Sequence, residues 1–236
     1  MSEERALIEA ENLSKAYGGM PVLRGISFRV RQGEFVALLG ANGSGKSTLL
    51  RLLSGLSKPT AGAVRIGGWE MPGEAMAVRA QIGLVAHQPL LYENLTAREN
   101  LDFFGKLYGI EREEREGRIA DLLRTVGLRK RADSLVRTFS RGMKQRLSIA
   151  RASLHQPDIL LLDEPYSGLD QASIERLDEM LSAGLGAGRA IIMSTHQLER
   201  VPQSAGRALV LSRGRITFDD AIDNRDMSEI YRSASA

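Results

Sequence analysis

The sequence has no cysteine among its 236 residues, so disulfides and cysteine-ligated metal centres are excluded. Aromatic residues make up only 5% of the chain, which is poor material for a surface that stacks nucleic-acid bases. The apolar runs are far too short to cross a bilayer, and the charged first residues do not resemble a signal peptide. If this protein acts at a membrane, we expect another chain to span it.

Repeats, low-complexity tracts and Pro/Ser-rich linkers are also lacking, and the net charge is only +3 with both signs interspersed. We therefore expect one compact unit. Residues 35–39 and 159–162 are apolar throughout and predict strands covered on both faces, whereas residues 26–30 alternate like a half-buried strand. Because such strands alternate with amphipathic helical segments, the fold class is α/β with a mostly parallel sheet.

The helical segments have clear boundaries. A helix is predicted from Ser47, with a buried side made of Leu49, Leu50, Leu52, Leu53 and Leu56. Thr96 and Glu99 have the spacing of a capping box, and another helix begins just after Ser140. The charge run at 112–118 is interpreted as a solvated helix surface. A hairpin is predicted for residues 209–218, turning at 212–214.

Residues 40–48 carry the strongest chemical signal. This segment lies between a predicted buried strand and a predicted helix, and it matches a phosphate-binding loop. Glycines let backbone N–H groups close around phosphate oxygens, and the helix N-terminus favours negative charge. Lys46 is expected to reach the β- and γ-phosphates, and the Ser47 hydroxyl to bind Mg²⁺. The nucleotide-binding residues are Gly40, Ala41, Asn42, Gly43, Ser44, Gly45, Lys46, Ser47 and Thr48.

Two acids follow the buried segment 159–162. In an open α/β sheet, ligands bind beyond the carboxyl ends of the strands, so both acids are placed beside the phosphate loop. Asp163 is expected to hold Mg²⁺, directly or through water. Glu164 is placed to act as the general base for the attacking water. Either acid alone could instead be a helix cap or a surface charge.

These motifs, in this order, resemble those of ATP-binding subunits of the ABC transporter superfamily over about residues 5–220. The resemblance implies a P-loop NTPase core with a small N-terminal antiparallel β part and a helical insertion. The core is assigned to 1–88 and 156–220, the helical subdomain to 89–155 and a C-terminal tail to 221–236.

Single residues gain roles only through this resemblance. Tyr17 resembles the aromatic residue that stacks on adenine, although it could equally be a packing residue. Gln88 resembles the glutamine that contacts Mg²⁺ and water, and His196 resembles the histidine that contacts the γ-phosphate. A dimer-interface loop is implied at Ser167, Gly168, Leu169 and Asp170, the last of which also suits a helix N-cap. His87 and His155 match no motif and receive no role.

Residues 139–146 are similar to the family's signature sequence, which binds the γ-phosphate of ATP held by the opposite subunit. The signature residues are then Ser140, Arg141, Gly142 and Met143. Arg141 stands where the family has a glycine, and Met143 where it has a glutamine. The arginine could crowd a backbone approach or add positive charge toward phosphate, and the sequence does not decide between these effects.

The resemblance further implies ATP and Mg²⁺ as cofactors and a homodimer or pseudo-dimer of ATP-binding subunits. It also implies separate transmembrane permease subunits, no nucleic-acid partner, and a peripheral location at the cytoplasmic face of the plasma membrane. Residues 87–104 and 140–143 are similar to the ATP-binding subunit of the haem exporter of bacterial cytochrome c maturation. Such stretches also occur in lipid, drug and other exporters.

Two other classes are disfavoured. Ribosomal ABC ATPases carry two such domains on one chain, and DNA-repair members carry a long coiled-coil or zinc insertion, neither of which is present here. A non-catalytic nucleotide-binding module is opposed by Glu164 and His196.

Overall fold

The computed structural model describes residues 6–71, 73–222 and 226–235. The charged start of the chain and part of the predicted tail at 221–236 lie outside these residues. Among the described residues, no helix is both long and apolar enough to cross a membrane.

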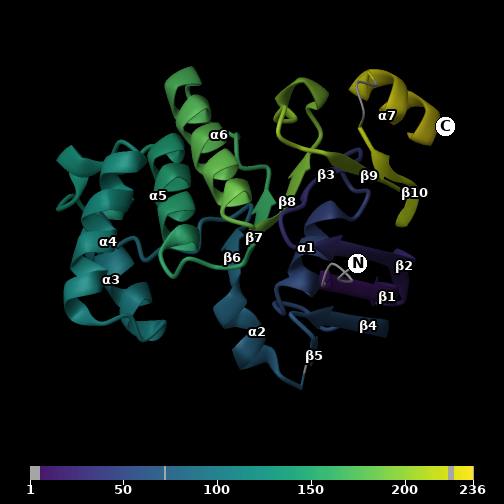
Figure 1. Cartoon of the computed structure of the whole chain (residues 1–236), viewed down its shortest axis with the longest axis horizontal. Helices are drawn as coiled ribbons and strands as arrows, with labels where there is room; N and C mark the ends of the chain where they lie inside the picture. The colour runs from purple at the N-terminus through teal and green to yellow at the C-terminus, as the bar shows by residue number, and fades with distance from the viewer. Residues whose placement is uncertain (1–5, 72, 223–225, 236) are drawn as a thin grey trace.

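A six-stranded sheet forms the centre of the molecule (Figure 1), in the order β10-β9-β3-β8-β7-β6. All neighbouring strands run parallel except β9 and β10, which form the predicted hairpin. The α/β fold class is therefore confirmed. The strands are β3 (Phe35–Leu39), β6 (Ile82–Val85), β7 (Ile159–Asp163), β8 (Ala190–Thr195), β9 (Arg207–Ser212) and β10 (Arg215–Ala221).

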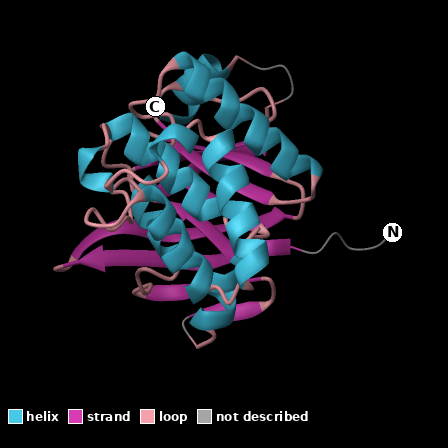
Figure 2. Ribbon diagram, turned by 90° about the vertical axis from the view of Figure 1, so that its left-hand side faces the viewer, coloured by secondary structure: helices cyan, strands magenta, loops and turns pink. Residues whose placement is uncertain are grey.

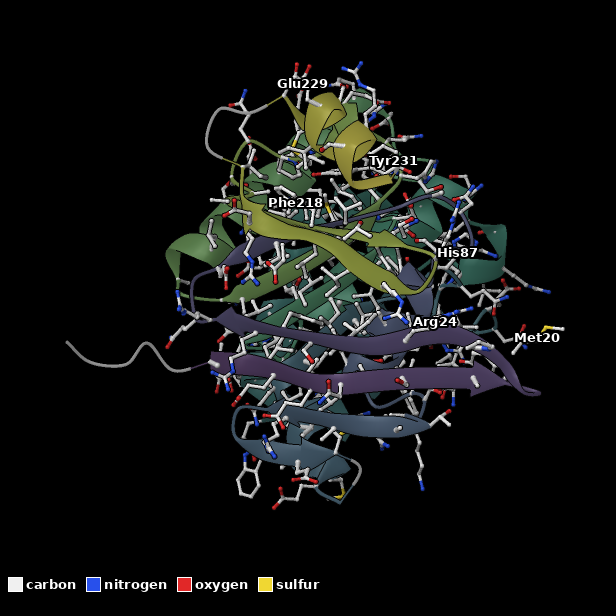
Figure 3. The ribbon with its side chains drawn as sticks, turned by 90° about the vertical axis from the view of Figure 1, so that its right-hand side faces the viewer. Met20, Arg24, His87, Phe218, Glu229 and Tyr231 are labelled. Carbon is white, nitrogen blue, oxygen red and sulfur yellow. The ribbon has the colours of Figure 1, made fainter. Side chains whose placement is uncertain are left out.

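The predicted N-terminal β part is a separate antiparallel sheet in the order β2-β1-β4-β5. Its long β1–β2 ribbon extends toward one side of the molecule in Figure 3, where Met20 marks the tip. Only short pieces of this ribbon were predicted from the sequence. The strands are β1 (Ala6–Tyr17), β2 (Met20–Arg31), β4 (Ala61–Ile66) and β5 (Trp69–Met71).

Helix α1 (Lys46–Leu53) shares a hydrophobic core with both sheets. Four of the five leucines predicted for its buried side are buried, but Leu56 is 49% exposed. The helix ends at Leu53, so Leu56 lies beyond the last turn and no longer follows the helical repeat. Strand β3 is wholly apolar because both of its faces are buried. Val36 and Leu38 face this core, while Phe35, Ala37 and Leu39 face the core on the other side of the sheet.

The helical subdomain packs around a third core at the end of the molecule away from the antiparallel sheet. Viewed from that end, its helices lie in front of the strands (Figure 2). Its main helices are α3 (Ala97–Leu107), α4 (Arg112–Thr125) and α5 (Arg141–Ser153), and short 3₁₀ turns at Arg129–Arg131 and Val136–Thr138 connect α4 to α5.

Two local predictions in this subdomain had different outcomes. The capping box is confirmed, because Thr96 Oγ1 accepts from the Glu99 N–H at 3.1 Å and Glu99 Oε2 accepts from the Thr96 N–H at 2.8 Å. The interpretation of 112–118 as a solvated surface is wrong for Arg115, which is buried. Its Nε donates to Asp102 Oδ1 at 2.7 Å, and this partly buried ion pair joins α4 to α3.

The second face of the central sheet is covered by α6 (Gln171–Gly186) and α7 (Met227–Ser235). In Figure 3, Phe218 of β10 lies below α7, which carries Tyr231; both side chains are partly buried against the core of this face. Two short helical elements, α2 (Ala75–Gln81) and a 3₁₀ turn at Leu198–Arg200, complete the connections. The carboxyl ends of β3, β7 and β8 are thereby left free to carry a site.

Candidate active site

The segment between β3 and α1 folds as a tight glycine loop. Gly45 precedes α1 with φ +111°, and a Cβ there would lie 2.6 Å from Leu23 Cδ2. At Gly40, a Cβ would lie 2.4 Å from the carbonyl oxygen of Leu211. Both positions therefore require glycine. The first N–H groups of a helix have no intrahelical acceptor, so this loop presents α1's positive end and free donors to an anion.

Lys46 is buried at the base of this loop, with 6% of the residue exposed. Its Nζ donates to the carbonyl oxygens of Gly40 at 2.7 Å and Ala41 at 3.2 Å. Burial lowers the pKa of the Lys46 ammonium, and the nearby carboxylates of Glu164 and Asp163 oppose that shift. An anionic ligand would relieve the desolvation of this cation.

The loop also contains an unsatisfied polar atom. Ser44 Oγ is buried and has no hydrogen-bond partner among the described residues. Buried hydroxyls in folded proteins are normally paired. A donor without a partner, beside a buried lysine and a helix N-terminus, fits a phosphate-bearing ligand.

Asp163 is the last residue of β7 and is held rigidly. It is 6% exposed, and its Oδ1 accepts a hydrogen bond of 2.6 Å from Ser194 Oγ on the neighbouring strand β8. This bond orients the carboxylate by joining two adjacent parallel strands. A carboxylate fixed in this way can hold a hydrated cation without losing much conformational freedom.

Glu164 adopts a backbone conformation that is unusual for a residue with a side chain, with φ +50°. Its N–H donates to the carbonyl oxygen of Ser194 at 3.1 Å. Its Oε1 lies 2.7 Å from His196 Nδ1, which leads us to place the donated proton on that nitrogen. Left-handed backbone in a non-glycine residue costs free energy and is typical of functional sites.

A cavity of about 520 Å³ brings half of the predicted site residues together. Its walls include these residues predicted from the sequence: Asn42, Gly43, Gly45, Lys46, Ser47, Thr48, Arg141, Asp163, Glu164, Ser167 and His196. The cavity also contains residues that sequence reasoning missed: Val22, His87, Tyr166, Thr195 and Gln197. Thr195, Gln197 and Tyr166 are chain neighbours of predicted residues and could have been found from that proximity.

Other predicted residues do not line this cavity. Tyr17 is 48% exposed at the end of β1, and Lys15 Nζ lies 4.8 Å from its ring centroid. Gln88 is exposed, and the residue before it, His87, takes a place in the cavity wall. The adenine-stacking role of Tyr17 and the metal-contacting role of Gln88 stay predictions.

The predicted signature begins α5, as expected. Ser140 Oγ caps the helix by accepting from the Met143 N–H at 3.3 Å. Arg141 Nη2 donates to Ser167 Oγ at 2.6 Å, so the signature contacts the predicted interface loop of the same chain. Gly142 fits closely against that loop, because a Cβ there would lie 2.5 Å from the carbonyl oxygen of Gly168.

The predicted interface loop ends at another helix cap. Asp170 Oδ1 accepts from the Ser173 N–H at 2.9 Å and begins α6. The hydrogen bonds from Ser173 hold the pKa of Asp170 below its usual value. Leu169 is partly buried against the core of the second sheet face. The N-cap alternative for Asp170 is therefore confirmed, and its role at a dimer interface stays a prediction.

The sequence profile of the ABC transporter family matches residues 23–167, which span the phosphate loop, the signature and both acids. The chain belongs to this family. It is 38% identical to the linearmycin resistance ATP-binding protein LnrL of Bacillus subtilis, over 89% of this chain and 68% of that protein. It is also 38% identical to the Nod factor export ATP-binding protein I of Paraburkholderia xenovorans, over 95% of this chain and 74% of that protein.

Solved structures lead to the same family. An ATP-binding subunit of an ABC transporter superimposes with a TM-score of 0.91 at 34% identity, covering 97% of this chain and 99% of that one. The ATP-binding cassette MJ0796, solved as a dimer in a post-hydrolysis state bound to ADP and Pi, superimposes with a TM-score of 0.83 at 29% identity, covering 91% and 98%. The chain is thus an ABC transporter ATP-binding subunit, an ATPase coupled to transport. A further structural neighbour, cbiO1 of Clostridium perfringens, is part of the ABC transporter complex cbiONQ and superimposes with a TM-score of 0.80 at 27% identity, covering 97% of this chain and 92% of that one.

Proposed function

We propose that this ABC ATPase drives an exporter, working as a dimer of ATP-binding subunits at the cytoplasmic face of a membrane and docked on separate permease subunits. Lys46 and the loop N–H groups bind the phosphates, Glu164 is the general base, and His196 orients it through the 2.7 Å contact. This fixed Glu164–His196 pair beside a buried phosphate-binding lysine is the observation that carries the hydrolytic part of the proposal.

Mg²⁺ would bind between the Ser47 hydroxyl, Asp163 and the phosphates of ATP. Hydroxyl and carboxylate oxygens suit this hard cation, which commonly takes one or two carboxylates together with substrate phosphates and waters. Among the described residues, no three His, Cys, Asp or Glu side chains form a group that could hold a metal without the nucleotide. The cation would neutralise the charge that develops on the phosphates, while Glu164 accepts the proton of the attacking water.

Transport is supported by an exposed apolar cluster next to the site, which we define as Leu90, Tyr92, Phe103, Leu107 and Tyr108. The rings of Tyr92 and Phe103 meet edge to face with their centroids 4.9 Å apart. The ring centroid of Phe103 lies 5.4 Å from that of Phe104, which is partly buried against the core of the helical subdomain. Exposed apolar patches of this kind mark protein interaction sites. The segment from His87 to Tyr92 links this cluster directly to the ATP cavity, so docking and hydrolysis can influence each other.

Purification from membranes tests this docking surface. We expect the wild-type chain to copurify with an integral membrane protein, and the double variant Phe103→Asp/Leu107→Asp to lose it while still binding ATP. Charges in the cluster would require desolvation on docking, which costs several kcal/mol in order of magnitude. Met76→Asp is the control, because Met76 is 86% exposed but lies outside the cluster. Retention of the membrane protein by the double variant would exclude this surface as the docking site.

Two substrate classes follow from different observations. The relatives named for linearmycin resistance and Nod factor export favour the export of a compound of one of these two kinds. The resemblance of residues 87–104 and 140–143 to the haem-exporter subunit favours a role in haem handling for c-type cytochrome biogenesis.

Deletion of the gene distinguishes these two candidates. If haem handling is the function, covalent haem attachment to c-type cytochromes should be lost while b-type cytochromes remain, as measured by haem staining and difference spectra. Complementation with the wild-type gene, but not with a Glu164→Gln copy, should restore attachment. Normal c-type cytochromes in the deletion strain would exclude the haem role and leave export of another compound.

A further inference from the structure

His87 lies in the wall of the nucleotide cavity, although no motif pointed to it. It follows β6, the strand that pairs with β7, and β7 ends at Asp163, directly before Glu164. His87 lines the main cavity and also an adjoining one of about 260 Å³, and both cavities include Asp163 and Glu164. Gln88 is exposed and lines neither of them.

The sheet order explains this placement. Strands β8, β7 and β6 are adjacent and parallel in the sheet, so the residues that follow them lie in a row at one edge. Glu164, after β7, therefore lies between His196, after β8, and His87, after β6. His196, after β8, is already hydrogen bonded to Glu164 through Nδ1. The ring of His87 forms no hydrogen bond or ion pair within the described residues. Its two nitrogens are therefore available to a ligand in the cavity.

We propose that His87, and not Gln88, is the ligand that the segment after β6 supplies to the cation of bound metal–ATP. This inference rests on the cation site proposed above at Ser47 and Asp163. The ring nitrogen of a neutral histidine binds Mn²⁺ and the later divalent metals better than it binds Mg²⁺, which prefers oxygen ligands. A histidine here gives the site a relative preference for Mn²⁺ that an amide oxygen would not give.

Pulsed electron paramagnetic resonance of bound Mn²⁺ tests the ligand directly. With Mn²⁺ and a non-hydrolysable ATP analogue, the wild-type protein should show nitrogen modulation from a coordinated imidazole. The modulation should disappear in His87→Gln and persist in Gln88→Ala. It should also persist in His196→Gln, the control for the second histidine of the cavity. Because His87 is exposed, its replacement is not expected to disturb folding.

Binding affinities give a second readout that does not need turnover. The dissociation constant for Mg–ATP divided by that for Mn–ATP should fall by about tenfold in His87→Gln, because loss of the nitrogen ligand weakens Mn–ATP binding more than Mg–ATP binding. The same ratio should stay unchanged in Gln88→Ala. Wild-type protein that binds Mn–nucleotide without nitrogen modulation, or an unchanged affinity ratio in His87→Gln, would overturn the proposal. Failure of the wild-type protein to bind metal–ATP at all would instead overturn the function proposed for the whole site.

Discussion

Replacing Glu164 with glutamine is expected to slow ATP hydrolysis by about 100- to 10,000-fold, the contribution typical of a positioned general base. The amide keeps the shape of the carboxylate but cannot take the proton of the attacking water. Binding of ATP should persist, because the phosphate loop and Lys46 are unchanged. Phosphate release and calorimetric titration measure the two quantities separately.

Glu179→Gln is the matched control for this variant. Glu179 is an exposed glutamate of α6 and does not line the ATP cavity, so its replacement should leave turnover unchanged. Full ATPase activity in Glu164→Gln would show that another group is the base and that the 2.7 Å contact with His196 has a structural role.

The same variant should reveal dimer formation. If Ser140 of one subunit contacts the ATP bound at Lys46 of the other, unhydrolysed ATP should hold two copies together, whereas ADP lacks the γ-phosphate for those contacts. Light scattering after size exclusion should therefore give a monomer without nucleotide and a dimer with ATP. In this chain Arg141 binds Ser167 of its own interface loop. A monomer at micromolar concentrations with ATP would indicate that this internal contact blocks the cross-subunit one.

Lys46→Ala has the second large expected effect. The buried ammonium is the loop's fixed positive charge, and hydrogen bonds to charged groups contribute roughly 1.5–3 kcal/mol each. We expect the dissociation constant for Mg–ATP to rise by about 100-fold or more, equivalent to about 2.7 kcal/mol. Isothermal titration calorimetry measures this change, with Lys130→Ala as a control at an exposed lysine outside the cavity.

Folding must be checked for this variant. Lys46 also donates to the carbonyl oxygens of Gly40 and Ala41, so its removal leaves two acceptors without their partner. A thermal unfolding curve without nucleotide separates this loss of stability from the loss of ligand binding. Unchanged ATP affinity in a folded Lys46→Ala protein would remove the phosphate loop from the site.

Local chemistry made several features predictable from the sequence alone. The wholly apolar β3, the glycine loop and the start of α1 follow one another within a few residues, and each depends on its own side chains and backbone freedom. The caps at Thr96, Ser140 and Asp170 likewise use contacts only three residues away. Such features need no knowledge of distant segments.

Two errors concern burial that the residue types alone do not show. Arg115 lies in a charge run, yet it is buried because Asp102 of another helix pairs with it. Leu56 continues a leucine pattern, but the helix ends three residues earlier and leaves the side chain half exposed. In both cases the residue type was visible, and only the surrounding structure decided its burial.

The sequence by itself determined the strand–loop–helix predicted to bind phosphate, the two acids at the carboxyl end of β7 and the family to which this chain belongs. The tertiary structure decided which residues meet those acids. His87 and Gln88 are adjacent in the bend that follows β6, so the sequence could not tell which of them lines the cavity. Only the parallel order β8-β7-β6 brings residues 87, 164 and 196, which are distant in the chain, to one edge of a sheet.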